Sequence, residues 1–196
     1  PSTSSAASDV YKRQASFNKT KLFLGPGTGL GASISINDIV LPTEIGNTFH
    51  SYLSLQKNYE FESQKSLVLE DLISGSAISN MYEIKTNHKI SSEEVLKKSR
   101  QDDPQAKIII NGFIKSLAET LSELAMTFMP GDGIFLAGNL IRNIYDDINK
   151  ENFDKIFLSN RRNVHKEILD MITIGVIMKE RTPLYGNLKL YQIINK

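Results

Sequence analysis

The stretch LFLGPGTGLGAS, from Leu22 to Ser33, places four glycines within seven residues. Apolar residues precede the glycines, and SISI at 33–36 follows them with the two-residue alternation of a β-strand. The stretch therefore predicts a glycine-rich turn between two strands. Taken alone, such a turn is compatible with a plain hairpin and with a loop whose backbone amides approach a phosphate closely.

Two common phosphate-binding motifs can be tested against this turn. A Walker loop needs Gly-Lys-Ser or Gly-Lys-Thr directly before a helix, and the sequence has neither at this position. GTGLGA, at 27–32, matches a loose Gly-x-Gly-x-x-Ala dinucleotide fingerprint, but that fingerprint must open a helix and a strand is predicted here. Thr28 favours phosphate binding, because its hydroxyl and the neighbouring amides can bind the same phosphate oxygen.

The composition narrows the classes of protein to consider. Of 196 residues, 40% are hydrophobic and 23% are charged, which predicts a globular core. The formal net charge of +1 gives no basic field for nucleic acid, and no apolar run approaches the roughly 20 residues that span a membrane. Cysteine is absent, which excludes disulfides, cysteine-zinc sites and thiol catalysis in this chain and is consistent with a cytoplasmic protein.

The order of the other elements predicts an α/β fold. PSTSSAASDVYKRQ, at 1–14, is small, polar and aperiodic, and we interpret it as a non-native or disordered leader outside the fold. After it, apolar spacing predicts strands that alternate with helices. The helices are expected at 65–84, with an interruption at Ser74–Gly75, and at 91–129, with a cap at Ser91 or Ser92 and a new start at Pro104. Two shorter helices are expected at 153–162 and 163–172. Short strands are expected at the start of 133–141 and at 173–178, and a final helix or extended tail is expected at 182–196.

Five segments of the chain resemble one known family. Strand, GTGLG, strand and then LPTE, at 41–44, is similar to the second phosphate-binding hairpin of bacterial-type glucokinases, in the actin-like sugar-kinase superfamily. The other segments resemble motifs of that family in the same order, namely LEDLISGSAISNMY at 69–82, GDGIFLAGNLIRN at 131–143, FDKIFLSNRR at 153–162 and TPLYGN at 182–187. The resemblance implies a ribonuclease H-like (actin-like ATPase) fold, in which 15–182 form the large domain of a sugar kinase and 183–196 return to a small domain that is missing here.

The resemblance implies that carboxylates after the glycine turn hold the sugar. By position these are Glu44 in LPTEIGN and Glu70 in LEDLISG, and charge-assisted hydrogen bonds from hydroxyls to carboxylates are the stronger kind. Asn47 stands where the family has a sugar-binding histidine, and its amide can still donate one hydrogen bond and accept another. His50, three residues further on, is an alternative if the loop is rearranged. Without the resemblance, both glutamates would be interpreted as solvated surface residues.

The resemblance also implies nucleotide contacts in two places. Gly27, Thr28 and Gly29 would contact the β- and γ-phosphates of ATP. Gly138 and Asn139 would pack beneath the nucleotide, where the missing Cβ of Gly138 lets the ligand come close. A simple strand-to-helix turn is the alternative for Gly138. Asn139 replaces the second glycine of the family's turn, and asparagine tolerates a left-handed backbone better than most residues.

The function that the resemblance implies is ATP-dependent phosphorylation of glucose to glucose 6-phosphate by the complete protein, with ATP and Mg2+ as cofactors. In the family the aspartate general base lies upstream of the glycine turn, so we predict neither a catalytic base nor a metal ligand in this chain and expect the chain alone to be inactive. A kinase for another hexose or an amino sugar, and a catalytically inactive nucleotide- or sugar-binding protein, stay open as alternatives. The family often dimerises, which makes a homodimer an expectation, and no nucleic acid or membrane is expected as a partner.

Overall fold

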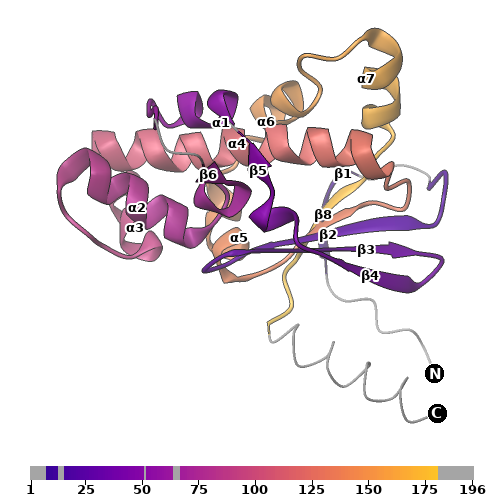
Figure 1. The fold of residues 1–196 in the computed structure, drawn as a ribbon, viewed down its shortest axis with the longest axis horizontal. Helices are drawn as coiled ribbons and strands as arrows, with labels where there is room; N and C mark the ends of the chain where they lie inside the picture. Colours follow the sequence, from indigo (N-terminus) through magenta and orange to yellow (C-terminus); the bar gives the residue numbers. More distant parts are fainter. Residues whose placement is uncertain (1–7, 13–15, 51, 64–66, 181–196) are drawn as a thin grey trace.

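The computed structural model describes residues 8–12, 16–50, 52–63 and 67–180, which form a six-stranded sheet, a two-stranded sheet and a layer of helices (Figure 1). The strands of the large sheet follow the order β1-β8-β7-β2-β3-β4. Their bounds are β1 Ser8–Lys12, β2 Thr20–Pro26, β3 Leu30–Ile36, β4 Ile39–Thr43, β7 Ile134–Leu136 and β8 Ile174–Ile177. β2, β3 and β4 form an antiparallel meander, β7 is parallel to both β2 and β8, and β1 is antiparallel to β8. The predicted α/β class is confirmed.

β2 and β3 form the predicted hairpin around the glycine turn. Their register pairs Pro26 with Leu30, so that residues 27–29 connect the two strands. Leu22 and Leu24 are buried while their neighbours along β2 are partly exposed, because successive side chains of a strand point to opposite faces of the sheet. The prediction of strand, glycine turn and strand is therefore confirmed.

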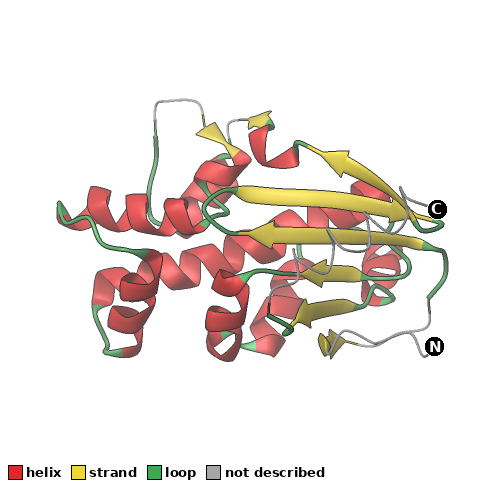
Figure 2. Ribbon diagram, turned by 90° about the horizontal axis from the view of Figure 1, so that it is seen from below, coloured by secondary structure: helices red, strands yellow, loops and turns green. Residues whose placement is uncertain are grey.

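The helices cover one face of the large sheet, and the long helix α4 runs across that face (Figures 1 and 2). Figure 2 shows the strands in front of the helices when the molecule is seen from below. The helical segments are η1 Ile45–Asn47, α1 Leu53–Asn58, η2 Leu69–Asp71, α2 Gly75–Thr86, α3 Ser92–Arg100, α4 Pro104–Phe128, α5 Asn139–Ile144, η3 Tyr145–Asp147, α6 Lys150–Phe157 and α7 Asn163–Asp170. A small sheet of β5, Phe49–His50, and β6, Leu67–Val68, joins the segments on either side of α1.

The starts of α3 and α4 follow from their capping residues. The Ser91 hydroxyl accepts a hydrogen bond from the Glu94 amide, and the Glu94 carboxylate accepts one from the Ser91 amide. Pro104 is the first residue of α4, where a missing amide hydrogen costs nothing, and the Asp103 side chain caps the helix by accepting from the Ala106 amide. The predicted cap at Ser91 and the predicted new start at Pro104 are both confirmed.

The helix predicted over 65–84 is wrong before Ser74. Ser74 caps α2 instead of interrupting a longer helix, because its hydroxyl accepts a hydrogen bond from the Ala77 amide at 3.0 Å. Upstream of this cap the chain forms β6 and η2. The sequence analysis did not predict α1 at all.

The structure describes part of the N-terminal segment but none of the tail at 182–196. Ser8–Lys12, within the segment interpreted as a leader outside the fold, form β1, whose backbone pairs with β8 at the edge of the sheet. The leader interpretation therefore does not hold for these five residues as far as folding is concerned. The tail predicted over 182–196 lies outside the described residues.

α4 carries much of the core. The helical spacing of the apolar residues in TLSELAMTFM, at 120–129, predicts that Leu121, Leu124, Ala125 and Phe128 belong to the core. Leu121, Leu124 and Ala125 are buried and Phe128 packs partly buried against the core, so this prediction is confirmed. Gly112 allows α1 to approach closely, since a Cβ at this position would lie 2.7 Å from the carbonyl oxygen of the last residue of α1.

Candidate functional site

The glycine turn is docked onto the first residue of α2. The Gly27 amide donates to the Gly29 carbonyl at 2.8 Å, and the Gly27 carbonyl accepts from the Gly75 amide at 2.7 Å. A Cβ on Gly75 would lie 3.1 Å from the Gly27 carbonyl oxygen and 3.2 Å from Ser92 Oγ. Glycine at Gly75 thus lets the turn, the start of α2 and the start of α3 come together.

A hollow of about 410 Å³ lies where these three segments meet α5. Gly27 and Thr28 line it from the turn, and Asn139 lines it from the first residue of α5. The structure thus brings two of the predicted phosphate-binding residues and one of the predicted nucleotide-packing residues to the same hollow. Thr28 and Asn139 are exposed, so both side chains are open to a ligand.

Gly138 makes the strand-to-helix turn from β7 to α5. Its φ of 107° is one that side-chain-bearing residues rarely adopt, and a Cβ would lie 3.2 Å from the Pro26 carbonyl oxygen. The turn that was considered as the alternative for Gly138 is therefore present. It also brings Asn139 beside the end of β2, where the glycine turn begins.

Glu70 lies against the glycine turn rather than in solvent. Its Oε2 accepts a hydrogen bond from the Leu30 amide at 3.2 Å, and a Cβ on Gly29 would lie only 2.6 Å from the same oxygen. The carbonyl of Glu70 accepts from the Ser74 hydroxyl at 2.7 Å, which ties η2 to the cap of α2. Half-buried Glu70 is therefore held beside Gly29, one of the residues predicted to bind phosphate.

Glu44 and Asn47 form a pair at the two ends of η1. Asn47 Nδ2 donates to Glu44 Oε2 at 3.1 Å, and both side chains are exposed. Between them Gly46 is buried, and a Cβ there would lie 2.5 Å from the Leu30 carbonyl oxygen. Because η1 packs against Leu30, whose amide binds Glu70, the three predicted sugar-binding residues gather around the start of β3.

Backbone pairing reinforces this arrangement. The Leu69 amide donates to the Thr48 carbonyl at 3.1 Å, and Phe49 pairs with Val68 in the small sheet. The segments that carry Glu44 and Glu70 are thus tied to each other as well as to β3. The structure does not describe the side chain of His50, the residue considered as a substitute for Asn47.

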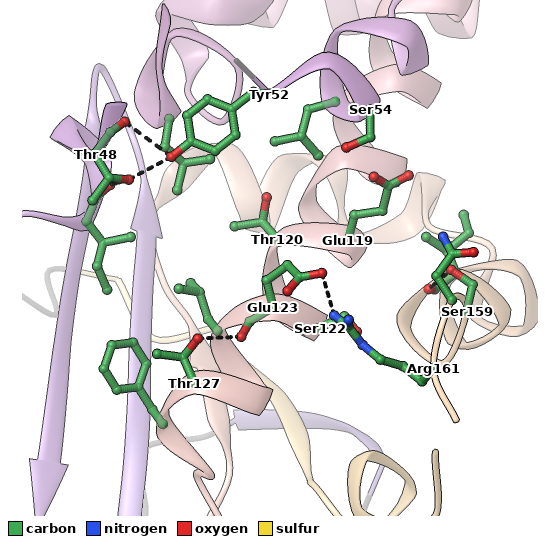
Figure 3. Close-up of a pocket in the computed structure, with 17 residues that line it drawn as sticks. Thr48, Tyr52, Ser54, Glu119, Thr120, Ser122, Glu123, Thr127, Ser159 and Arg161 are labelled. Atoms are coloured by element: carbon green, nitrogen blue, oxygen red, sulfur yellow. Dashed lines mark hydrogen bonds and ion pairs between the residues drawn. The ribbon is translucent and has the colours of Figure 1, made fainter. Parts of the chain in front are cut away.

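A second cavity, of about 570 Å³, is lined in part by residues of η1 and η2 (Figure 3). Polar side chains of α4 line it together with residues of η1, α1, η2, α6 and the turn after α6. The sequence gives no direct sign of this cavity, because the apolar spacing within 120–129 predicts only core residues there. The polar residues Thr120 and Ser122, which are almost fully buried, were the available signal.

Over the part of the chain that the structure describes, no group of three or more His, Cys, Asp or Glu side chains is arranged to hold a metal ion. None of the helices described has the length and apolar character needed to cross a membrane.

Comparison with known proteins identifies the family. A family model described as Glucokinase matches residues 3–192. The chain belongs to the glucokinase family. A glucokinase of Helicobacter acinonychis is 27% identical over 192 residues, which cover 86% of this chain and 56% of that protein. The chain therefore spans somewhat more than half the length of this curated relative of the family.

Solved structures agree with the family and show the fold. A glucokinase from an Antarctic psychrotroph superposes with a TM-score of 0.75 at 19% identity, over 95% of this chain and 62% of that one. A ROK-family glucokinase from Streptomyces griseus, in complex with glucose and AMPPNP, gives a TM-score of 0.52 at 16% identity, over 79% of this chain and 60% of that one. The predicted ribonuclease H-like fold of the actin-like sugar kinases is confirmed.

Proposed function

We propose that the protein containing this chain transfers a phosphoryl group from ATP to glucose. One observation carries the proposal beyond family membership: the Glu70 carboxylate lies against Gly29 and Leu30, at the end of the glycine turn. A sugar kinase must hold a hydroxyl next to the terminal phosphate of ATP, since phosphoryl transfer depends mainly on positioning and on stabilisation of charge. A carboxylate that binds sugar beside a turn that binds phosphate meets this need.

The nucleotide would occupy the 410 Å³ hollow. Amides of 27–29 and the Thr28 hydroxyl would hold the β- and γ-phosphates, and the N-terminus of the twelve-residue helix α2 points its partial positive charge toward the same place. Gly138 and Asn139 would lie beneath the nucleotide. The Streptomyces griseus relative binds AMPPNP, an ATP analogue, and Mg2+ would arrive bound to ATP.

The sugar would be held by Glu44, Asn47 and Glu70. The hydrogen bond from Asn47 orients one oxygen of Glu44 and leaves the other free to accept from a sugar hydroxyl. Asparagine replaces the family's histidine at this point, so the hydrogen bonds offered to the sugar differ from those of the family. A kinase for another hexose or an amino sugar is the alternative that this substitution favours.

The catalytic base is assigned to no residue of this chain. We propose that residues 15–182, together with β1, form the large domain, that 183–196 return toward a small domain, and that an aspartate of that small domain removes the proton from the sugar hydroxyl. Under this proposal the chain by itself binds ligands but does not turn over. A cytoplasmic location and a homodimeric state belong to the same proposal.

An assay of ADP release with a panel of sugars tests the activity. The protein carrying this chain is expected to release ADP with glucose and ATP, and Glu70→Gln is expected to raise the KM for glucose about tenfold or more through loss of a charge-assisted bond. Glu167→Gln, an exposed residue of α7, is the matched control and should behave as the unaltered protein.

Three outcomes would change this picture. Faster turnover with another hexose or an amino sugar would reassign the substrate. Binding of ATP and a sugar without any turnover by the full-length protein would favour an inactive binding protein instead. Steady turnover by the 196-residue chain alone would contradict the assignment of the base to another segment.

A further inference from the structure

We propose that the 570 Å³ cavity lined by η1, η2 and α4 is a second ligand site, which binds a small molecule with an apolar body and a protonated amine. Its volume is within the range of pockets that hold small molecules, about 300–1,000 Å³. It is separate from the hollow between the glycine turn and α5, with which it shares no lining residue. The proposal goes beyond the kinase activity and does not depend on it.

The apolar part of the wall is formed by side chains from four elements. Leu55 of α1, Leu69 of η2, Leu124 of α4 and Ile156 of α6 all line the cavity. Leu55, Leu69 and Leu124 are at most 9% exposed, so this part of the wall belongs to the core itself. Such a surface favours the hydrocarbon part of a ligand, because covering it removes apolar area from water.

Thr120 supplies an unused polar group inside the cavity. The residue is only 5% exposed, and its hydroxyl oxygen has no hydrogen-bond partner within the described structure. Figure 3 shows this hydroxyl pointing into the space between Tyr52 and Glu119. Buried hydroxyls are nearly always hydrogen-bonded, so an unpaired one that faces a cavity indicates a partner that occupies the cavity.

The charges around the cavity select for a cation. Its lining has two carboxylates, Glu119 and Glu123, and one guanidinium, Arg161. Arg161 is engaged, since it donates to Glu123 Oε1 at 2.6 Å and to Ser122 Oγ at 3.2 Å. Glu119 accepts from the neutral amide of Asn58 at 3.1 Å and forms no ion pair with any described residue.

A ligand ammonium would therefore be attracted to Glu119 and could donate to the hydroxyl of Thr120, the next residue of the same helix. An anionic ligand would meet the Glu119 carboxylate, while the one cation of the lining is already paired with Glu123. A neutral ligand of the same shape would gain the apolar contacts and a bond to Thr120 but no charge interaction. The expected order of affinity is amine, then alcohol, then carboxylate.

The site adjoins the segments to which sugar binding was assigned. Ile45 and Leu69, which line the cavity, are the chain neighbours of Glu44 and Glu70. Neither Glu44 nor Glu70 lines the cavity itself. Binding in the cavity can therefore be measured, and altered by substitution, without touching the residues assigned to the sugar.

Three probes with the same apolar ring test the order of affinity: cyclohexanemethylamine, cyclohexanemethanol and cyclohexanecarboxylate. Binding is followed by methyl NMR of Thr120 and Ile156 in the isotopically labelled protein. The amine is expected to shift both methyl signals saturably, the alcohol more weakly, and the carboxylate not at all over the same concentrations. Absence of a saturable shift with the amine, or a carboxylate that binds as tightly as the amine, would overturn the proposal.

Two substitutions make the test independent of any one variant. Glu119→Gln is expected to weaken amine binding about tenfold and to leave alcohol binding within about twofold, since only the charge is removed. Thr120→Val is expected to weaken both probes and to raise the melting temperature of the unliganded protein, because a buried unpaired hydroxyl is removed. Glu167→Gln on α7 is the control and should change neither probe.

Thr120→Val keeps the test possible even if Glu119→Gln does not fold. If Glu119→Gln fails to fold, Thr120→Val still decides the proposal, since unchanged binding of both probes would refute the hydrogen bond to the Thr120 hydroxyl on which the proposal rests. Unchanged amine affinity in a folded Glu119→Gln variant would likewise refute the charge argument. Neither result bears on ATP or glucose binding, which is measured separately.

Discussion

Gly29→Ala tests whether the contact between the glycine turn and Glu70 is functional. A Cβ on Gly29 would lie 2.6 Å from Glu70 Oε2, a separation that real Cβ atoms do not show. Among the described glycines only Gly133 and Gly138 have positive φ, so alanine fits the backbone of Gly29 without strain. The turn can therefore keep its shape while the Glu70 carboxylate has to move away.

The size of the effect follows from what the carboxylate loses. Moving Glu70 breaks its charge-assisted hydrogen bond with the Leu30 amide, and since Glu70 is half-buried we expect about 1–2 kcal/mol of lost stability. If the same carboxylate holds a sugar hydroxyl, a further loss of about 1.4 kcal/mol or more in binding corresponds to at least about tenfold weaker glucose binding.

Calorimetric titration with glucose measures the binding, and Gly31→Ala provides the matched control. A Cβ on Gly31 would meet only the Gly25 carbonyl oxygen at 3.9 Å, an ordinary contact, so the same methyl group is added two residues along β3 without displacing anything. Glucose affinity should fall in Gly29→Ala and stay within about twofold in Gly31→Ala. Equal affinity in both variants and the unaltered protein would refute the assignment of Glu70 to the sugar.

Three further predictions concern the fold. Gly112→Ala should lower the free energy of unfolding by about 1–3 kcal/mol in denaturant titrations, because the added Cβ would lie 2.7 Å from Asn58 O and 2.8 Å from Tyr59 Cδ1; a change below about 0.5 kcal/mol would contradict this packing. Burial raises the pKa of Tyr59, so above a pH of about 10 the unfolded chain loses a proton from this residue that the folded chain keeps. The free energy of unfolding should therefore fall with rising pH less steeply in Tyr59→Phe than in the unaltered protein. Equal slopes in the two proteins would contradict the raised pKa of Tyr59. Ser74→Ala should lower the free energy of unfolding by about 1 kcal/mol, because the hydroxyl that caps the Ala77 amide and donates to the Glu70 carbonyl is lost; an unchanged melting temperature would contradict this.

Local patterns were sufficient to predict the hairpin and two of the helix starts. The alternation before and after the glycines fixes β2 and β3, because period and turn chemistry act over a few residues. Ser91 and Pro104 mark helix starts for equally local reasons, since each satisfies or removes an amide of the first turn. These features need no information from elsewhere in the chain.

The predictions for α1, for the segment before α2 and for β1 failed for two reasons. Either the local sequence carries no signal for the element, or its signal fits two structures. α1 has six residues and begins after Tyr52, which has a left-handed backbone and gives the helix no side-chain cap, so no start signal exists in the sequence. Ser74–Gly75 was interpreted as an interruption because serine and glycine weaken helices, yet the same serine is a strong cap. β1 depends on pairing with β8, which is more than 150 residues away along the chain (Ser8 pairs with Ile177).

The candidate site also has features that the local sequence predicts and features that it does not. Family motifs identified Glu70, but its bond to Leu30 joins residues 40 positions apart and could not be derived from either segment. The cavity lined by Thr120 needs α1 and η1 to be folded against α4, and the apolar spacing of α4 alone indicated a closed core. The chemistry of a residue is thus predictable from a motif, whereas its partner is decided by how distant segments pack.

Two glycines of the turn show why this distinction matters for function. Gly29 leaves room for Glu70, because the Glu70 carboxylate occupies the space that a Cβ would need. Gly27 is exposed and a Cβ there would meet nothing within 4 Å, so neither the fold nor the contact with Gly75 requires glycine at this position. Any requirement for glycine at Gly27 must then come from a ligand that approaches the backbone from outside. A loss of ATP affinity in Gly27→Ala without a loss of stability would therefore locate the phosphate at the outer side of the turn, opposite the carboxylate that Gly29 accommodates.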